Sequence, residues 1–157
     1  MKIVLLTIGK TKESFLKSGI NQYISRLKYY TNFQIIEIVK HKKLGNVTHA
    51  ELVDIEGKII LNHVDESDYL ILLDSKGIEY TSLEFSTKIQ KWMLSGKKRL
   101  VFAIGGPYGF SQDMYIRSNE KLSLSKMTFS HQMIRLFFLE QLYRSYTIIN
   151  NSPYHHE

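Results

Sequence analysis

Apolar residues along this chain are concentrated in short runs that are separated by longer stretches of helical periodicity. The runs lie at residues 1–8, 33–39, 69–73 and 100–104, and their length and branched side chains favour strands. Between the first two runs, apolar positions recur at helical spacing and predict an amphipathic helix over about residues 12–30. Apolar strands that alternate with helices are typical of a mostly parallel sheet covered on both faces. The pattern therefore predicts an α/β fold.

Two helix starts carry the capping-box pattern, in which a threonine precedes a glutamate by three residues. Thr48 with Glu51 and Thr81 with Glu84 fit this pattern, and Gly96 is placed to end the second of these helices. The remaining expected elements are an exposed basic loop at residues 41–46, a turn at residues 75–77, a short helix capped by Ser111, a short strand near residues 122–125 and a helix over about residues 131–146.

The last predicted helix has almost no polar face. Apolar or aromatic side chains occupy most of its positions, namely Met133, Ile134, Leu136, Phe137, Phe138, Leu139, Leu142, Tyr143 and Tyr146. A helix that is apolar all round needs cover on every side. The sequence favours an isologous homodimer as the second cover, and a central helix buried within one subunit is the alternative.

Length and composition narrow the possible chemistry. At 157 residues the chain is expected to form one domain, residues 1–157, with a core of its own. The absence of cysteine excludes disulfides, thiolate metal ligands and a cysteine nucleophile, and no metal site is expected. A net charge of +6 favours a polyanionic partner such as RNA. The apolar runs are too short for a signal sequence or a membrane span, so we expect a cytoplasmic protein with no membrane partner.

The glycine-rich segment at residues 105–109 follows an apolar strand, where open α/β sheets place their ligands. It is not a dinucleotide fingerprint, because that motif follows the first strand, and it lacks the Gly-Lys-Ser/Thr ending of a phosphate loop. A ligand without phosphates, such as S-adenosylmethionine, fits better, with Leu73 and Gly105 among its contacts. The alternative from the residues alone is an ordinary turn.

The ordered motifs of the chain resemble one known family. They are Gly9-Lys10, Leu73-Asp74, Ile104-Gly105-Gly106-Pro107-Tyr108-Gly109, the segment from Leu122 to His131, Glu140-Gln141-Leu142-Tyr143-Arg144 and Pro153-Tyr154-His155. Together they are similar, essentially from end to end, to the small SPOUT-class methyltransferases of large-subunit ribosomal RNA. One departure is Ser130, at a position where a proline is expected in relatives; a serine there can cap the following helix.

The resemblance implies a fold, an activity and a site. The fold would be an α/β SPOUT domain whose carboxyl-terminal part forms a trefoil knot. The activity would be transfer of a methyl group from S-adenosyl-L-methionine to N3 of a pseudouridine in 23S rRNA, in the large subunit or the assembled ribosome, by a homodimer that binds RNA across both subunits. The residues that would hold the donor are Leu73, Gly105, Leu124, Ser125, Lys126, Met127, Thr128 and Phe129.

Three residues near the carboxyl end are candidates for catalysis. His155 is the leading candidate to handle the N3 proton or orient the base, although a terminal histidine can also be a frayed tail. Tyr154 could stack on the base or serve as a packing anchor. Arg144 could bind a phosphate or polarise a uracil carbonyl, while an i,i+4 ion pair with Glu140 is the competing interpretation.

Two rival functions are open at this point. One is a non-enzymatic RNA-binding protein, which would not bind S-adenosylmethionine, and the other is a nucleotide-dependent oxidoreductase. Basic clusters that could contact RNA phosphates are Lys40, Lys42 and Lys43, and Lys97, Lys98 and Arg99, although most such clusters are merely solvated.

Overall fold

The structure is a computed structural model that describes residues 1–39 and 47–154, so the basic loop expected at residues 41–46 and the candidate His155 lie outside the described residues. The described chain forms a five-stranded sheet with the strand order β2-β1-β4-β3-β5. All neighbouring strands are parallel. The strands are β1 (Lys2–Ile8), β2 (Asn32–Ile38), β3 (Tyr69–Glu79), β4 (Arg99–Ile104) and β5 (Glu120–Ser123).

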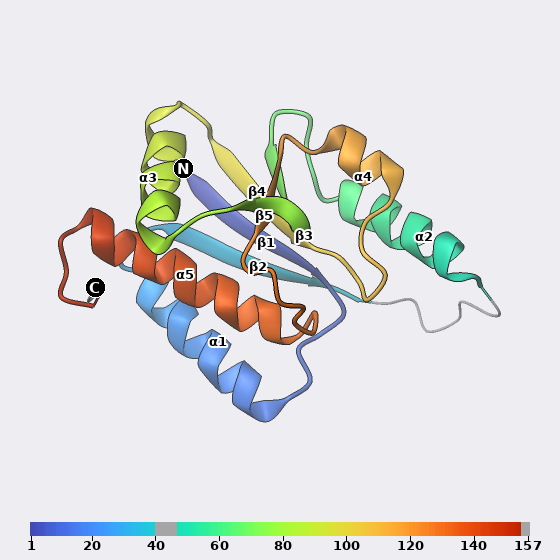
Figure 1. Cartoon of the computed structure of the whole chain (residues 1–157), viewed down its shortest axis with the longest axis horizontal. Coiled ribbons are helices and arrows are strands. Elements are labelled where there is room, and N and C mark those ends of the chain that lie inside the picture. The colour runs from blue at the N-terminus through green and yellow to red at the C-terminus, as the bar shows by residue number, and fades with distance from the viewer. Residues whose placement is uncertain (40–46, 155–157) are drawn as a thin grey trace.

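Helices cover both faces of the sheet, as the sequence predicts (Figure 1). One face carries α1 (Ser14–Leu27), α3 (Ser82–Leu94) and α5 (Met133–Ile149). The opposite face carries α2 (His49–Leu61) and the short α4 (Gln112–Arg117). The predicted α/β fold is therefore confirmed.

The central strands are apolar along their whole length because each face of the sheet has its own core. In β1, Ile3 and Leu5 belong to the core beneath α1, α3 and α5, while Val4 and Leu6 belong to the core beneath α2 and α4. All four side chains are fully buried. Alternation of side chains across a strand thus serves two apolar layers and leaves no polar face.

Both capping boxes form as predicted. The Thr48 hydroxyl accepts from the Glu51 backbone N–H at 3.2 Å and the Glu51 carboxylate accepts from the Thr48 N–H at 2.7 Å. Thr81 and Glu84 repeat the arrangement at the start of α3. Gly96 follows α3 with a positive φ of 73°, which favours glycine at a helix end.

The turn predicted at residues 75–77 is wrong. The strand continues to Glu79, and its pairing with β5 shifts register between Leu73 and Ile78. The turn-like sequence marks this irregularity: the Asp74 carboxylate accepts from the Lys76 N–H at 2.8 Å. A Cβ at Gly77 would lie 2.6 Å from the backbone of Leu122, so glycine here permits close approach of two strands.

Helix α5 lies against the sheet between α1 and α3 (Figure 1). Phe138, Leu139 and Leu142 are fully buried within the subunit. The outward face is less covered, since Phe137 keeps 38% of its surface exposed. The subunit itself therefore supplies most of the cover for this apolar helix, and cover by a second copy stays a prediction.

A buried arginine links the start of α5 to the carboxyl ends of β1 and β2. Arg135 is fully buried, and its guanidinium donates to the Ile8 carbonyl at 2.9 Å and to the Thr11 hydroxyl at 3.0 Å. Its Nη1 also lies 3.3 Å from the carboxylate of Glu37 at the end of β2. Burial lowers the pKa of Arg135 and the Glu37 charge acts in the opposite direction. Three segments far apart in the sequence meet at this one side chain.

Replacement of Arg135 with alanine is expected to destabilise the fold by about 3 kcal/mol, because Glu37 loses its charged partner, the Ile8 carbonyl loses its guanidinium donor and a cavity forms. Urea denaturation measures this free energy of unfolding. Lys17→Ala, at an exposed position of α1, is the control. In the double variant with Glu37→Gln the two losses should not add. A loss below about 1 kcal/mol for Arg135→Ala would contradict the role of this cluster.

Candidate functional site

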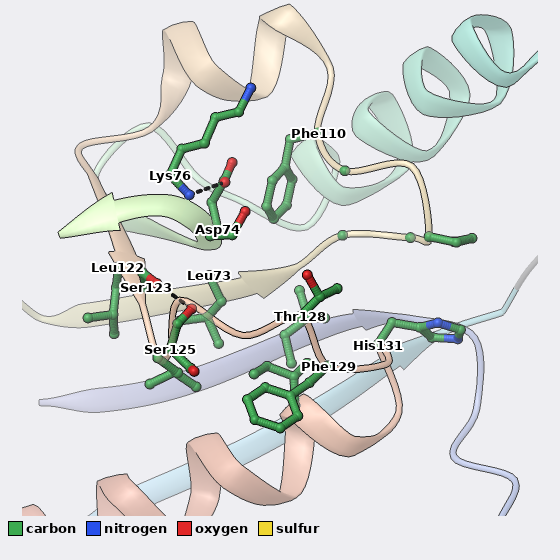
Figure 2. A pocket seen from close by; sticks show the side chains of 18 of the residues that line it. Leu73, Asp74, Lys76, Phe110, Leu122, Ser123, Ser125, Thr128, Phe129 and His131 are labelled. Atoms are coloured by element: carbon green, nitrogen blue, oxygen red, sulfur yellow. Dashed lines mark hydrogen bonds between the residues drawn. The ribbon is translucent and has the colours of Figure 1, made fainter. Parts of the chain in front are cut away.

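A cleft of about 520 Å³ opens at the carboxyl ends of β4 and β5 and beside residues 73–76 of β3. Ligands of parallel α/β sheets bind at this edge, and the volume lies within the usual range for small-molecule sites. Side chains from the strand ends and from the segment that leads into α5 surround one space (Figure 2). The lining comprises residues 73–76, 104–110, 122–125 and 127–129 together with Tyr115, His131 and Ile134.

The glycine-rich segment forms one wall and needs its glycines for steric reasons. A Cβ at Gly105 would lie 2.8 Å from the Gly109 carbonyl oxygen. A Cβ at Gly106 would lie 2.1 Å from the buried carboxylate of Glu56 on α2. Gly109 has a positive φ of 85°. The segment thus folds tightly back on itself, and at its glycines the backbone itself borders the cleft.

The opposite wall is the segment between β5 and α5, which short-range hydrogen bonds hold in shape. The Ser125 hydroxyl accepts from the Met127 N–H at 2.9 Å, and the Ser123 hydroxyl donates to the Ser125 carbonyl at 3.0 Å. The Ser130 hydroxyl accepts from the Met133 N–H at 3.2 Å, so the predicted capping role of this serine is confirmed.

The upper edge of the cleft is fixed by a tyrosine and an aspartate. The Tyr115 hydroxyl of α4 donates to the Asp74 carboxylate at 2.5 Å. Burial raises the pKa of Tyr115 to about 12, and the hydrogen bond to Asp74 and its charge act in the same direction. In Figure 2, Asp74 lies near Phe110 on the side of the cleft away from Phe129. This pair holds the middle of β3 against α4.

Most residues predicted to hold a methyl donor line the same cleft, namely Leu73, Gly105, Leu124, Ser125, Met127, Thr128 and Phe129. Lys126 is not among the lining residues of the described chain; its Nζ lies 3.9 Å from the Glu79 carboxylate. The lining residues come together because β3, β4 and β5 are adjacent in the sheet although they are distant in sequence.

Two of the predicted catalytic residues, Arg144 and Tyr154, do not line the cleft. Arg144 lies in the second half of α5 (Met133–Ile149) and Tyr154 follows the helix, whereas Ile134 at the start of the helix lines the cleft. At 1.5 Å per residue, Arg144 lies about 15 Å along the helix from Ile134. The structure therefore does not bring Arg144 and Tyr154 to the cleft of their own subunit.

The carboxyl-terminal tail is anchored on its own subunit. The Tyr154 hydroxyl lies 3.2 Å from the Tyr23 hydroxyl of α1 and donates to the Glu140 carboxylate at 3.3 Å. The Arg144 guanidinium lies 4.9 Å from the centre of the Tyr154 ring and donates to Glu140, so the competing i,i+4 ion pair is present. Burial raises the pKa of Tyr154, and the bond to Tyr23 adds to this. Tyr154 of the tail thus joins Glu140 and Arg144 of α5 in one cluster of phenol, carboxylate and guanidinium.

Several site residues escaped sequence interpretation. Tyr115, His131 and Ile134 line the cleft, yet nothing in their spacing relates them to the glycine-rich segment. The role of Gln132 was also missed: its side-chain amide accepts from the Lys12 N–H at 2.9 Å and donates to the Lys10 carbonyl at 3.1 Å. A histidine and a glutamine beside a serine cap are the signals that could have pointed to them.

One basic cluster predicted as a candidate RNA contact is engaged within the protein. Arg99 begins β4, at the edge opposite to the cleft, and pairs with Asp65 and Asp68 at 3.1 and 2.7 Å. The Lys97 ammonium lies 4.5 Å from the centre of the Tyr69 ring. The other cluster, at residues 40–43, lies outside the described residues.

The comparisons with known proteins identify the family. The profile of a family described as predicted SPOUT methyltransferase matches residues 1–155, so the chain belongs to the SPOUT methyltransferases. A ribosomal RNA large subunit methyltransferase H from Parabacteroides distasonis is 52% identical over 157 residues, which is all of both chains. Relatives of the same name are 53% identical in Cytophaga hutchinsonii, over 99% of this chain and 100% of the relative, and 49% identical in Flavobacterium psychrophilum, over all of both chains.

Two further observations concern membrane-spanning helices and metal ligands among the described residues. None of their helices combines the length and apolar character that crossing a membrane requires. Over the same residues, no group of histidine, aspartate and glutamate side chains is arranged to hold a metal ion.

Replacement of Asp74 with asparagine is expected to lower the pKa of Tyr115 from about 12 while leaving it above the usual value of about 10, because burial, the largest cause, remains. NMR titration of ring-labelled tyrosine measures this, with Tyr115→Phe to assign the signal. The raised pKa also means that this tyrosine stabilises the fold fully below about pH 10 and loses that contribution between about pH 10 and 12. An unchanged titration in Asp74→Asn would contradict the coupling.

Proposed function

We propose that this protein is an S-adenosyl-L-methionine-dependent methyltransferase that acts on N3 of a pseudouridine in 23S rRNA. The carrying observation is the cleft of about 520 Å³ at the carboxyl edge of the sheet, in a chain that belongs to the SPOUT methyltransferases. The full-length relatives named ribosomal RNA large subunit methyltransferase H support ribosomal RNA as the substrate. The proposal includes a single domain over residues 1–157, a carboxyl-terminal trefoil knot and a cytoplasmic site of action on the large subunit or ribosome.

The residues of the cleft fit the proposed donor. Leu73, Ile104 and Phe129 provide apolar walls for an adenine ring, and the tight glycine-rich segment exposes backbone donors and acceptors. The wall at residues 124–129 adds further backbone groups. A neutral purine bound through apolar contact and backbone hydrogen bonds needs this kind of lining. Gly105, Leu124, Ser125, Lys126, Met127 and Thr128 complete the proposed donor site.

The proposed chemistry relies mainly on positioning. When bound, the donor would supply a methyl group from a sulfonium: the bond between N3 and the methyl carbon would form as the bond between that carbon and sulfur breaks, the donor would leave as a neutral thioether, and the N3 proton would pass to a base. The protein contributes alignment of the nitrogen with the methyl carbon and removal of water from the cleft. A group near the acceptor must take the N3 proton, and His155 is proposed for this step because imidazole exchanges protons near neutral pH.

A homodimer would bring the tail to the cleft. Arg144 lies about 15 Å along α5 from Ile134 at the cleft, and Tyr154 packs against Arg144 after the helix ends, so both can serve a donor held by a second copy. The proposed partner contact is an isologous one, in which each tail reaches the other cleft. In that arrangement Tyr154 stacks on the base and Arg144 binds a phosphate or a uracil carbonyl. The anchoring of Tyr154 by Tyr23 and Glu140 would fix the direction of the tail.

Replacement of Gly105 with valine is expected to abolish donor binding, because even a Cβ would lie 2.8 Å from the Gly109 carbonyl oxygen. Isothermal calorimetry with S-adenosylmethionine should show binding to the unmodified protein and none to the variant. Leu94→Ala, at an exposed position of α3, should bind normally. Absence of S-adenosylmethionine binding to the unmodified protein would favour a non-enzymatic RNA-binding protein. A rise in the melting temperature with NAD, and none with S-adenosylmethionine, would favour an oxidoreductase.

Removal of residues 153–157 is expected to abolish methylation while donor affinity stays close to that of the full chain. Mixed dimers test whether the tail acts across subunits. A Gly105→Val subunit lacks a working cleft and a truncated subunit lacks a tail, so their mixed dimer keeps one complete site. Equal mixing by co-refolding should restore about a quarter of the original activity.

The substrate for this assay is ribosomes from a strain that lacks the gene for this protein, with methyl-labelled S-adenosylmethionine. Each variant alone should be inactive. Continued inactivity after mixing, with heterodimers demonstrated by mass spectrometry, would show that cleft and tail must belong to one subunit. Normal methylation by the truncated protein would remove the tail from the mechanism.

A further inference from the structure

A second depression of about 320 Å³ adjoins the cleft and is separated from it by an aromatic ridge. Its lining includes His49, Asp54, Tyr108 and Gln112. Tyr108 and Phe110 line both the depression and the cleft, so these two side chains form the ridge. A ligand that occupies the depression therefore lies next to whatever occupies the cleft.

Tyr108 and His49 form a stacked pair on this ridge. Their ring centres are 3.9 Å apart and their planes differ by 20°. Tyr108 nevertheless keeps 49% of its surface exposed. A planar aromatic ring that is supported from one side and accessible from the other has the form of the platforms on which proteins stack unpaired RNA bases.

The pair is held rigidly by α2. His49 is the first residue of this helix and lies between Thr48 and Glu51, which form the capping box. Glu56, on the same helix, lies directly against the glycine-rich segment: a Cβ at Gly106 would be only 2.1 Å from its carboxylate. The helix start and the glycine-rich segment thus position each other, and a rigid platform loses little entropy when a base binds.

From this geometry we infer that Tyr108, backed by His49, is a stacking platform for an unpaired RNA base that flanks the methylated nucleotide. The inference rests on the proposed function, since the cleft holds the donor and the target base lies at its mouth. The Asp54 carboxylate and the Gln112 amide line the same depression and offer an acceptor and a donor to the edge of a base. Tyr108 is the contact residue and His49 is a positioning residue.

Steady-state kinetics on ribosomes from a strain lacking the gene for this protein tests the inference. Tyr108→Ala is expected to raise the KM for ribosomes about 5- to 100-fold, because stacking of one base on an aromatic ring contributes that much affinity. His49→Ala should raise it in the same direction and by less. Tyr108→Phe and His49→Phe keep a flat ring and should remain close to the unmodified protein.

Two further readouts separate stacking from other effects. Stacking releases no counterions, so the slope of ribosome affinity against salt should be unchanged in Tyr108→Ala. Donor affinity, measured by calorimetry, should be unchanged in His49→Ala, since His49 is not among the described residues that line the cleft. Tyr29→Ala, which removes a tyrosine that is 89% exposed on another face of the chain, is the matched control.

Two outcomes would overturn the platform. One is an unchanged KM for ribosomes in Tyr108→Ala. The other is a rise in KM that comes with an equal loss of donor affinity in both alanine variants, which would assign the pair to holding the glycine-rich segment. Failure of the unmodified protein to methylate these ribosomes would instead reject the proposed function, so the two failures are distinguishable.

Discussion

The position of the cleft depends on one buried guanidinium. Arg135 binds the last carbonyl of β1, its neighbour Gln132 binds the backbone just after β1, and Arg135 also pairs with Glu37 at the end of β2. The ends of β1 and β2, on the side of the sheet away from β5, therefore hold the start of α5. They also fix the segment between β5 and α5, which forms one wall of the cleft. A buried charge is costly to desolvate, so this arrangement persists because its partners are complete. Polar contacts at this point specify where an otherwise apolar helix lies along the sheet.

The two ends of α5 have different roles in the structure. Its amino end supports the cleft, and its carboxyl end carries the cluster of Arg144, Glu140 and Tyr154. Because a helix is stiff, the distance between these ends is a fixed property of the subunit. This separation is the physical reason for proposing that two copies cooperate, and it agrees with the exposed Phe137 on the outer face of α5.

Much of the fold follows from the sequence because local signals and burial agree there. Apolar runs marked the strands, and the threonine and glutamate pairs marked two helix starts, since both depend on neighbours in the chain. The continuation of β3 through Gly77 was missed because its cause is the backbone of Leu122, which local sequence does not show. The same limit applies to the site. The walls of the cleft were predicted, partly through the family resemblance. Tyr115 and the partners of Arg135 were missed, because their contacts depend on packing between segments distant in sequence.

The strand order has a consequence for the way the chain is made. β1 lies between β2 and β4, and Lys2 stands beside Arg99 in the register. During synthesis the first strand must wait for the fourth before its second edge is paired, and its apolar face can bind other chains in the interval. Such non-local pairing also slows folding. Nascent chains of this protein are thus expected to depend on shielding by chaperones until the middle of the sheet closes.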